Sequence, residues 1–143
     1  MSGWDFYGNT MRNCSTGVLL GGGRDNHIHD NIFIDNDRDI AFDNRGMNWQ
    51  AKCCQIDCDP ALGTSCFHAG LVALNYTNPP YSTAYPEIVN IYNDHPCTPV
   101  HNVIEGNRWC HTNSKGGGQF LSHNETTIES WLSSATNNSE HCG

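Results

Sequence analysis

Arginine, aspartate and histidine side chains gather on both sides of a short apolar segment near the N-terminus. Such residues suit a polysaccharide lyase, because a cation must neutralise a uronate carboxylate while a base removes the C5 proton. Arg45 or His29 could act as the base. Arg24 could bind the carboxylate, and Asp43 completes this candidate catalytic set. The alternative is that the two arginines form ion pairs with Asp25 and Asp43 and only hold a turn of the chain.

Aromatic and polar side chains beside this set could bind a sugar. Trp49 follows Arg45 closely, and an exposed indole offers a flat apolar face on which a sugar ring can stack. Asp25 and His27 complete the predicted substrate-binding set.

Two histidines, His27 and His29, lie at alternate positions of a predicted strand. Their side chains therefore share one face, about 7 Å apart, while Ile28 points to the other face. Two imidazoles at this spacing could bind a metal ion together with Asp30 or with a residue of a neighbouring repeat. The alternative is that they are solvent-facing residues on an outer sheet.

An acidic segment has the opening spacing of a calcium-binding EF-hand loop, with Asp35, Asp37 and Asp39 at alternate positions. Its sixth and twelfth residues are Ile40 and Gly46 instead of Gly and Glu, so it is not an EF-hand. A calcium ion could still bind at this turn, and otherwise we expect that no cofactor is required.

The chain has eight cysteines, which is a high and even number. We expect all of them to form disulfides: Cys14, Cys53, Cys54, Cys58, Cys66, Cys97, Cys110 and Cys142. The spacing from Cys53 to His68 could also supply zinc ligands, but adjacent cysteines favour disulfides. The pairing stays open, since eight cysteines allow 105 connectivities.

Four N-glycosylation sequons accompany the cysteines, at Asn13, Asn75, Asn124 and Asn137. Together these features predict a secreted, extracellular protein. The N-terminus carries no signal peptide. We therefore expect this chain to be a C-terminal fragment of a longer secreted solenoid, with upstream coils missing.

A repeat of 22 residues organises the first third of the chain. Gly8-Asn9 precedes Asp30-Asn31 by this step, and Val18 and Leu20 precede Ile40 and Phe42 by the same step. Short strands at such a period, with no helix long enough for a crossover, predict a parallel β-helix. The pattern returns at 101–109, which aligns with 25–33.

The same alignment assigns inward and corner positions. Ile28 and Phe33 are expected to face the core, with Trp109 buried in the column of Phe33. Asn9, Asn31 and Asn107 recur at one turn per repeat and are expected to form a stacked asparagine ladder.

Two short helices are expected outside the repeat. Pro86 in the first turn of 84–93 favours one of them. Ile128, Trp131 and Leu132, spaced at three and four residues, favour the other at 126–134.

Charge and hydropathy exclude two classes of partner. The formal net charge is -8 and only 7 residues are Lys or Arg, which argues against a nucleic-acid binder. No apolar stretch reaches the roughly 18 to 20 residues of a membrane span, so we expect no membrane insertion.

The segment Asn26–Phe33, Asn-His-Ile-His-Asp-Asn-Ile-Phe, resembles the coil repeat of right-handed parallel β-helix proteins of the pectin-lyase-like superfamily. The blocks at 20–26, 42–46 and 85–88 resemble secreted proteins with a right-handed β-helix region. The resemblance implies the fold. It does not select a function, because the superfamily contains lyases, hydrolases, epimerases, adhesins and tailspikes. The Asn-Thr-Asp, Asp-Asp, Gly-His-Gly and Arg-Ile-Lys strings of polygalacturonases are absent.

The predicted architecture is an all-β single domain, a right-handed parallel β-helix of about two to three coils. Its coils comprise 4–48 and 100–112, with a disulfide-rich excursion at 49–99 and a short helical or irregular C-terminal cap and tail at 113–143. End-to-end association with further β-helix coils is expected to be available to such a fold.

The predicted function is that of a secreted carbohydrate-directed protein with a polysaccharide or glycan partner. It could be a polysaccharide lyase or glycoside hydrolase, or part of one. A non-catalytic carbohydrate-binding or adhesive module and a structural repeat segment of an extracellular matrix or surface assembly are the alternatives.

Overall fold

The computed structural model describes residues 2–59, 66–123 and 131–142. The chain divides into two compact units. The first comprises Met1–Asp43 and Pro99–Gly143 and is called the repeat unit below. The second, Asn44–Thr98, is called the excursion unit and includes most of the segment 49–99 predicted to leave the repeat.

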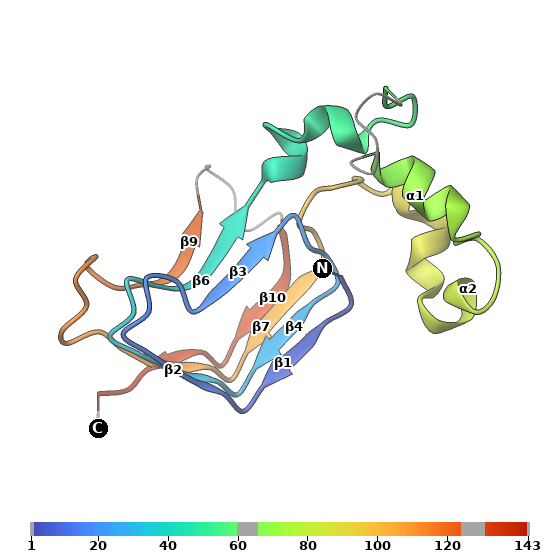
Figure 1. Ribbon diagram of the computed structural model, residues 1–143. Helices are drawn as coiled ribbons and strands as arrows, with labels where there is room; N and C mark the ends of the chain where they lie inside the picture. The colour runs from blue at the N-terminus through green and yellow to red at the C-terminus, as the bar shows by residue number, and fades with distance from the viewer. Residues whose placement is uncertain (1, 60–65, 124–130, 143) are drawn as a thin grey trace. The chain divides into compact units, whose positions relative to one another are not determined.

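The repeat unit holds all of the described strands, in three parallel sheets. Sheet A contains β1 (Asp5–Tyr7), β4 (His27–His29), β7 (Asn102–Glu105) and β10 (Leu132–Thr136). Sheet B contains β2 (Thr10–Arg12), β5 (Ile32–Ile34), β8 (Arg108–Cys110) and β11 (Ser139–Glu140). Sheet C contains β3 (Val18–Gly21), β6 (Arg38–Asp43) and β9 (Gln119–His123). The described chain is thus mostly β, with parallel sheets and few helices (Figure 1).

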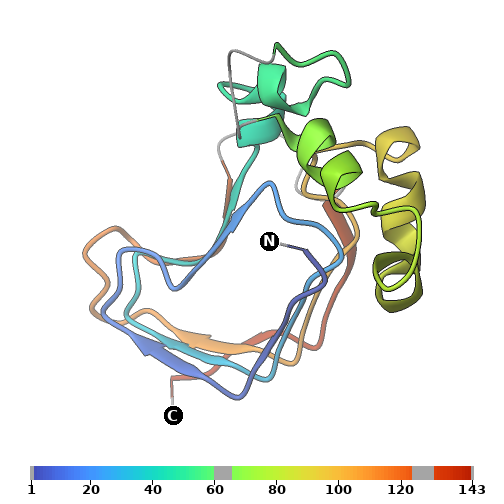
Figure 2. The same cartoon turned by 45° about the vertical axis from the view of Figure 1, so that its right-hand side comes forward.

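The chain visits the sheets in the same order on each passage, A then B then C, as both views of the molecule show (Figure 2). The predicted 22-residue register is confirmed, because Phe6 lies opposite Ile28 and Val18 opposite Ile40. The predicted return of the pattern is also confirmed, since Ile28 lies opposite Ile104. Corresponding residues of successive passages therefore form columns.

The columns that point inward form the core. The fully buried side chains of Ile28, Ile40 and Ile104 belong to it. Burying each of them stabilises the fold by about 2 kcal/mol, before the entropy cost. Phe33 is buried as predicted, but Trp109 is only half-buried, and its ring stacks on the half-buried Phe120 at 4.2 Å.

The corners between sheets A and B share one backbone conformation. Gly8, Asp30, Gly106 and Asn137 have φ values between 52° and 67°. This left-handed region is open to glycine and tolerated by Asp and Asn, which explains these residue types. The chain can therefore turn by the same angle on every passage.

The residue after each of these corners is an asparagine whose amide joins one passage to the next. The backbone N–H of Asn9 donates to Oδ1 of Asn31 at 3.0 Å, and that of Asn31 donates to Oδ1 of Asn107 at 3.0 Å. The backbone N–H of Asn107 in turn donates to Oδ1 of Asn138 at 3.0 Å. The predicted ladder is present and includes a fourth member.

The C-terminal segment differs from the prediction. The helix expected at 126–134 is wrong for its described part, because Leu132 begins strand β10, which pairs with β7. The tail is also not loose throughout, because Ser139 and Glu140 pair with β8. Apolar residues at three- and four-residue spacing fit either structure over so short a window. Here the edge of the sheet decides, because it offers unpaired backbone groups.

The excursion unit consists of short helices and turns. Its helices are η1 (Arg45–Met47), η2 (Ala51–Cys54), α1 (Phe67–Ala73), α2 (Tyr81–Ala84) and η4 (Pro86–Asn93). The predicted helix at 84–93 corresponds to η4, which is a 3-10 helix. Two disulfides, Cys54–Cys97 and Cys58–Cys66, join its segments.

Burial in the excursion unit is limited. Among its described residues, only Cys66, Leu71 and Ile91 are buried apolar side chains. The Tyr92 hydroxyl is buried without a hydrogen-bond partner, and this burial raises the pKa of Tyr92 to about 12. None of the described helices has the length and apolar character needed to cross a membrane.

Candidate metal centre

Two histidines of strand β4 lie on the outer face of sheet A. Ile28 between them is fully buried, so His27 and His29 point away from the core as predicted. Their rings stack with centroids 4.1 Å apart. Tyr7 of the adjacent strand β1 stacks on His29 at 5.0 Å and limits the motion of that ring.

A carboxylate from β1 lies against both imidazoles. Asp5 pairs with His27 in the sheet register. Its Oδ1 atom is 3.0 Å from His29 Nε2 and 3.6 Å from His27 Nδ1. Asp5 was missed at the level of sequence, although the 22-residue step from Phe6 to Ile28 places Asp5 opposite His27 in the same way.

The other ring nitrogen of each histidine is also held by a carboxylate. His27 Nε2 is 2.8 Å from Glu105 Oε1, and His29 Nδ1 is 2.8 Å from Asp30 Oδ2. In metal sites, a carboxylate on the far nitrogen fixes the imidazole tautomer and orientation and makes the ligating nitrogen more basic. The cluster thus has both an inner set of donors and an outer set of supporting carboxylates.

The inner set has the spacing of metal ligands. Asp5, His27 and His29 each offer one donor atom, and the three atoms lie within 4.8 Å of one another. Two donors that each lie about 2 Å from one ion are separated by roughly 3 to 4 Å. Small rotations of exposed side chains reach this spacing, since the side chains of His27 and Asp5 are 38% and 60% exposed.

The donor types select the kind of ion. Two imidazole nitrogens and a carboxylate oxygen suit Cu(II), Zn(II) or Ni(II), whereas calcium and magnesium prefer an all-oxygen set. The hydrogen bond to Asp30 raises the pKa of His29 above its ordinary value, burial lowers it, and the charge of Asp5 raises it further. The local field is therefore negative and attracts a cation.

The predicted lyase residues lie in a different part of the fold. Arg24 is only 4% exposed, and its Nε atom is 2.9 Å from Asp25 Oδ2. The ion pair that we gave as the alternative is present, and a buried guanidinium is not accessible to a polymer. Asp43 ends strand β6 in sheet C, so the structure does not bring it together with His29 of sheet A.

Arg45 and Trp49 belong to the excursion unit. The Trp49 side chain is 69% exposed, and the Arg45 guanidinium carbon lies 5.8 Å from the centroid of its ring. A guanidinium at this distance over an indole gains about 0.5 to 1 kcal/mol at an exposed site. The role of these two residues in carbohydrate binding stays a prediction.

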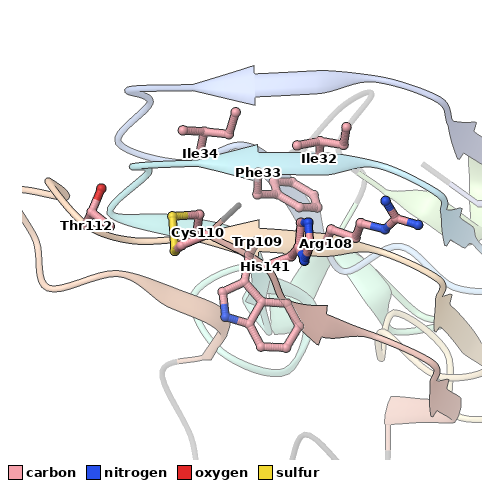
Figure 3. A pocket seen from close by; sticks show the side chains of 9 residues that line it. Ile32, Phe33, Ile34, Arg108, Trp109, Cys110, Thr112 and His141 are labelled. Atoms are coloured by element: carbon pink, nitrogen blue, oxygen red, sulfur yellow. A yellow bond between two sulfur atoms is a disulfide. The ribbon is translucent and has the colours of Figure 1, made fainter.

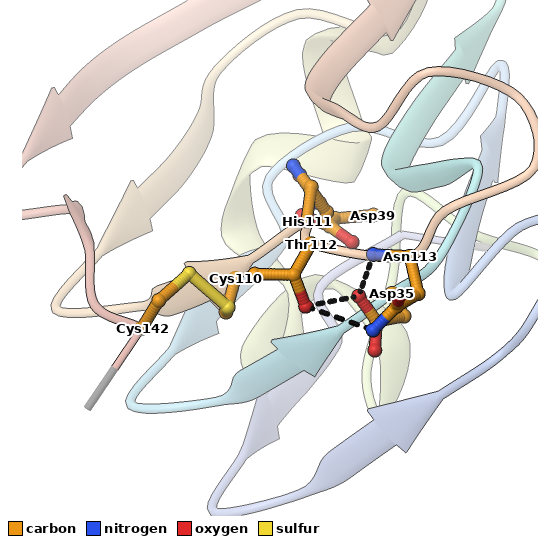
Figure 4. The surroundings of a disulfide bond; sticks show 7 residues. All are labelled: Asp35, Asp39, Cys110, His111, Thr112, Asn113 and Cys142. Carbon is orange, nitrogen blue, oxygen red and sulfur yellow. Dashed lines mark hydrogen bonds and ion pairs between the residues drawn. A yellow bond between two sulfur atoms is a disulfide. The ribbon is translucent and has the colours of Figure 1, made fainter.

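The acidic turn does not present its carboxylates together to a cation. Asp35 Oδ1 accepts the backbone N–H of Asn113 at 2.7 Å, which lowers the pKa of Asp35 (Figure 4). Asp37 Oδ1 accepts the backbone N–H of Gly116. Asp39 is fully buried, and its Oδ2 atom is 2.8 Å from His111 Nε2. The structure gives no support for calcium here.

The cysteines form three disulfides, and the third, Cys110–Cys142, closes the C-terminal end of the repeat unit onto β8 (Figure 4). The prediction that all eight are paired is wrong for two of them, Cys14 and Cys53, which are free thiols. Zinc ligation by the cysteine cluster is not possible in this state, because Cys54, Cys58 and Cys66 are bound as disulfides.

Three of the four sequon asparagines, Asn13, Asn75 and Asn137, are exposed, as a glycosylation acceptor must be. Asn124 lies outside the described residues. Whether any of them carries a glycan stays a prediction.

Comparison with known proteins gives one match. Residues 3–56, less than half of the chain, are similar to the family described as periplasmic copper-binding protein (NosD). This is a parallel β-helix family with the pectin-lyase-like fold. No curated protein and no solved structure matches the chain. The family's description does not fit our expectation that no cofactor is required, and the matched residues include Asp5, His27 and His29.

Proposed function

We propose that this chain belongs to an exported protein that binds a divalent transition-metal ion, Cu(II) first of all, on the outer face of a short parallel β-helix. Asp5, His27 and His29 are the ligands in this proposal. One observation carries it: two imidazoles and a carboxylate converge from neighbouring strands, and the far nitrogen of each imidazole is already held by Glu105 or Asp30.

The β-helix part of the proposal rests on the strand register. Each sheet takes one strand from every passage, and the 22-residue step is the same in sheets A, B and C. We propose a right-handed winding with two to three full coils. A rigid sheet of this kind suits a metal site, because ligands on strands are held more firmly than ligands on loops.

Export is supported by two independent features. Three disulfides are typical of an oxidising compartment. The family that residues 3–56 resemble is described as periplasmic. We propose that the protein works outside the cytoplasm, in the periplasm or the extracellular space.

Copper is the first choice among the ions that fit. Imidazole and carboxylate donors bind Cu(II) more tightly than the other divalent first-row ions, and the resembling family is described as copper-binding. When bound here, the ion would have open coordination positions, because the described residues supply only three ligands from the cluster and the face is exposed to solvent.

The test is a titration of the intact chain with Cu(II) and Zn(II), followed by calorimetry and, for Cu(II), by electron paramagnetic resonance. We expect one strong site with nitrogen hyperfine structure from two imidazoles. Removing a supporting carboxylate by Glu105→Gln should weaken binding about 10- to 100-fold, and His27→Gln or His29→Gln should weaken it more.

His141→Gln is the matched control, since this exposed histidine follows β11 in sheet B and is outside the cluster. It should bind copper as the wild type does. Equal affinity of the wild type and His29→Gln would refute the site, and so would the absence of a stoichiometric site in the wild type.

We propose carbohydrate binding as a second candidate function, with one observation in its favour. The exposed Trp49 ring and the Arg45 guanidinium beside it combine a stacking face with a cation, which fits an acidic sugar. Such a face can bind a glycan with or without cleaving it. Lyase or hydrolase chemistry is the finer form of this proposal.

Incubation with a panel of acidic and neutral polysaccharides tests it, with retention and new unsaturated or reducing ends as the two readouts. Trp49→Ala should reduce retention, and Arg45→Ala should remove any unsaturated ends. Tyr85→Ala, at another exposed aromatic residue of the excursion unit, is the control. Neither retention nor cleavage by the wild type would leave a structural segment as the remaining alternative to metal binding.

A further inference from the structure

A pocket of about 330 Å³ lies on sheet B, away from the histidines of sheet A. Its walls come from Ile32–Ile34 of β5 and Arg108–Cys110 of β8, and His141 and Cys142 follow from the C-terminal segment. Figure 3 shows Ile32 and Ile34 on one strand and Arg108 and Cys110 on its neighbour. A volume of this size matches the lower end of small-molecule sites.

Most of the lining is apolar. Ile32 points outward from β5 and is 42% exposed, which is unusual for a large aliphatic side chain on a polar surface. The Cys110–Cys142 disulfide and the half-buried Trp109 add further apolar atoms. Trp109 is held in place by its stacking on Phe120, so this part of the pocket is preformed.

One strong charge lies in this apolar setting. Arg108 is exposed at the pocket, and no carboxylate of residues 2–59, 66–123 and 131–142 forms an ion pair with it. This is notable in a chain with a net charge of -8, where acidic partners outnumber basic ones. A planar guanidinium with free N–H groups is suited to a two-point contact with a carboxylate.

We propose that this pocket binds a small organic carboxylate with a flat or aliphatic apolar body. The carboxylate contacts Arg108, and the body lies on Ile32 and Ile34 beside the disulfide. A monoanion fits better than a phosphate or a polyanion, because a single arginine provides the permanent charge. A neutral sugar fits less well, because Arg108, Thr112 and His141 are the only polar side chains of the lining and most of the surface is apolar.

This site is independent of the proposed metal centre. The ligands Asp5, His27 and His29 belong to sheet A, and none of them lines the pocket. Failure of one proposal therefore leaves the other standing.

The experiment uses the full ¹⁵N-labelled chain, with 2-naphthoate as the probe and 2-naphthamide as its neutral counterpart. The chain has four tryptophans, so its indole N–H signals are few, and Trp109→Phe and Trp49→Phe assign two of them. We expect 2-naphthoate to shift the Trp109 signal in a saturable way. 2-Naphthamide should bind at least about tenfold more weakly, since a charge-assisted hydrogen-bonded pair is lost.

Arg108→Gln should weaken 2-naphthoate to the level of the amide and leave amide binding unchanged. Arg12→Gln is the matched control, because Arg12 is an exposed arginine of the same sheet outside the pocket lining. Three results would overturn the proposal: equal binding of carboxylate and amide, an equal effect of both arginine substitutions, or a shift of the Trp49 signal alone.

Discussion

The repeat unit and the excursion unit are stabilised by different means. In the repeat unit, each inward side chain packs on its equivalents in the passages before and after, as Ile28 does between Phe6 and Ile104. In the excursion unit, three buried apolar side chains among the described residues accompany two disulfides. Repetition therefore provides a continuous core, whereas the non-repeating segment depends on covalent cross-links.

Truncation of a core side chain should give the largest effect and should act on the repeat unit. Phe33→Ala removes a fully buried ring and should lower the free energy of unfolding by about 3 to 5 kcal/mol. Denaturant unfolding followed by far-ultraviolet circular dichroism measures it. Leu19→Ala, at an exposed position of β3, should change stability by no more than about 0.5 kcal/mol. Similar losses for both variants would contradict the assigned core.

Loss of a disulfide should affect the excursion unit alone. Cys54→Ser with Cys97→Ser opens a loop of 43 residues, and the loop-entropy relation gives about 4 kcal/mol, with measured values more often about 2 to 4. Hydrogen exchange should show faster amide exchange in α1 and η4 and unchanged exchange in sheets A to C. Cys53→Ser, at a free thiol of the same unit, should leave exchange unchanged. Faster exchange in the sheets would show that the repeat unit also depends on this bond.

Breaking the asparagine ladder should have an intermediate effect. Asn107→Ala removes the acceptor for the Asn31 backbone N–H, as well as the donor to the Ile28 carbonyl. Each buried group left without a partner costs about 1 to 3 kcal/mol. Denaturant unfolding should show a loss of at least about 2 kcal/mol. Asn113→Ala, at an exposed asparagine of the same unit, is the comparison, and equal losses would exclude a special role of the ladder.

The smallest effect should come from Asp39 and should depend on pH. Burial raises the pKa of Asp39 above the value 3.8, while hydrogen bonds from Asn36 and the charge of His111 lower it in part. A carboxyl with a raised folded-state pKa contributes stability below pH 3.8, and that contribution is lost as pH rises through the folded pKa. Asp39→Asn should therefore gain stability relative to the wild type between pH 3 and pH 5.5.

Unfolding free energies of the two proteins, measured across this pH range, test the sign. Asp35→Asn is the contrasting control. The pKa of Asp35 is lowered by the Asn113 backbone N–H, so the ionised wild-type side chain stabilises the fold above pH 3.8. This variant should lose stability relative to the wild type as pH rises. A parallel pH course for both variants would contradict the assigned directions.

The fold of the repeat unit was largely predictable, because equal spacing translates directly into columns. The step from Phe6 to Ile28 identifies strands, inward faces and the ladder at once. The same step, applied to polar residues, would also have identified Asp5 as the neighbour of His27. The metal ligands were thus within reach of the sequence, and only the outward columns were left unexamined.

The rest could not be predicted for physical reasons. Between Glu105 and Thr136 the step lengthens to 31 residues and includes a register shift, so β10 does not follow the repeat. Disulfide pairing in the excursion unit depends on a chain path that has no period. Burial of Arg24 against Asp25 depends on tertiary packing, and sequence cannot distinguish it from an exposed catalytic arginine.

The register also shows how the chain was assembled. Successive passages are separated by 22 residues between β4 and β1 but by 76 between β7 and β4, and 76 exceeds 22 by 54. The excursion unit accounts for this surplus, so it is an insertion at a single corner of one repeat, between Asp43 and Pro99. Such corners are places where a lineage can add, exchange or delete whole segments while the columns on either side stay in step. A shortened chain that joins 43 to 99 would restore the uniform period.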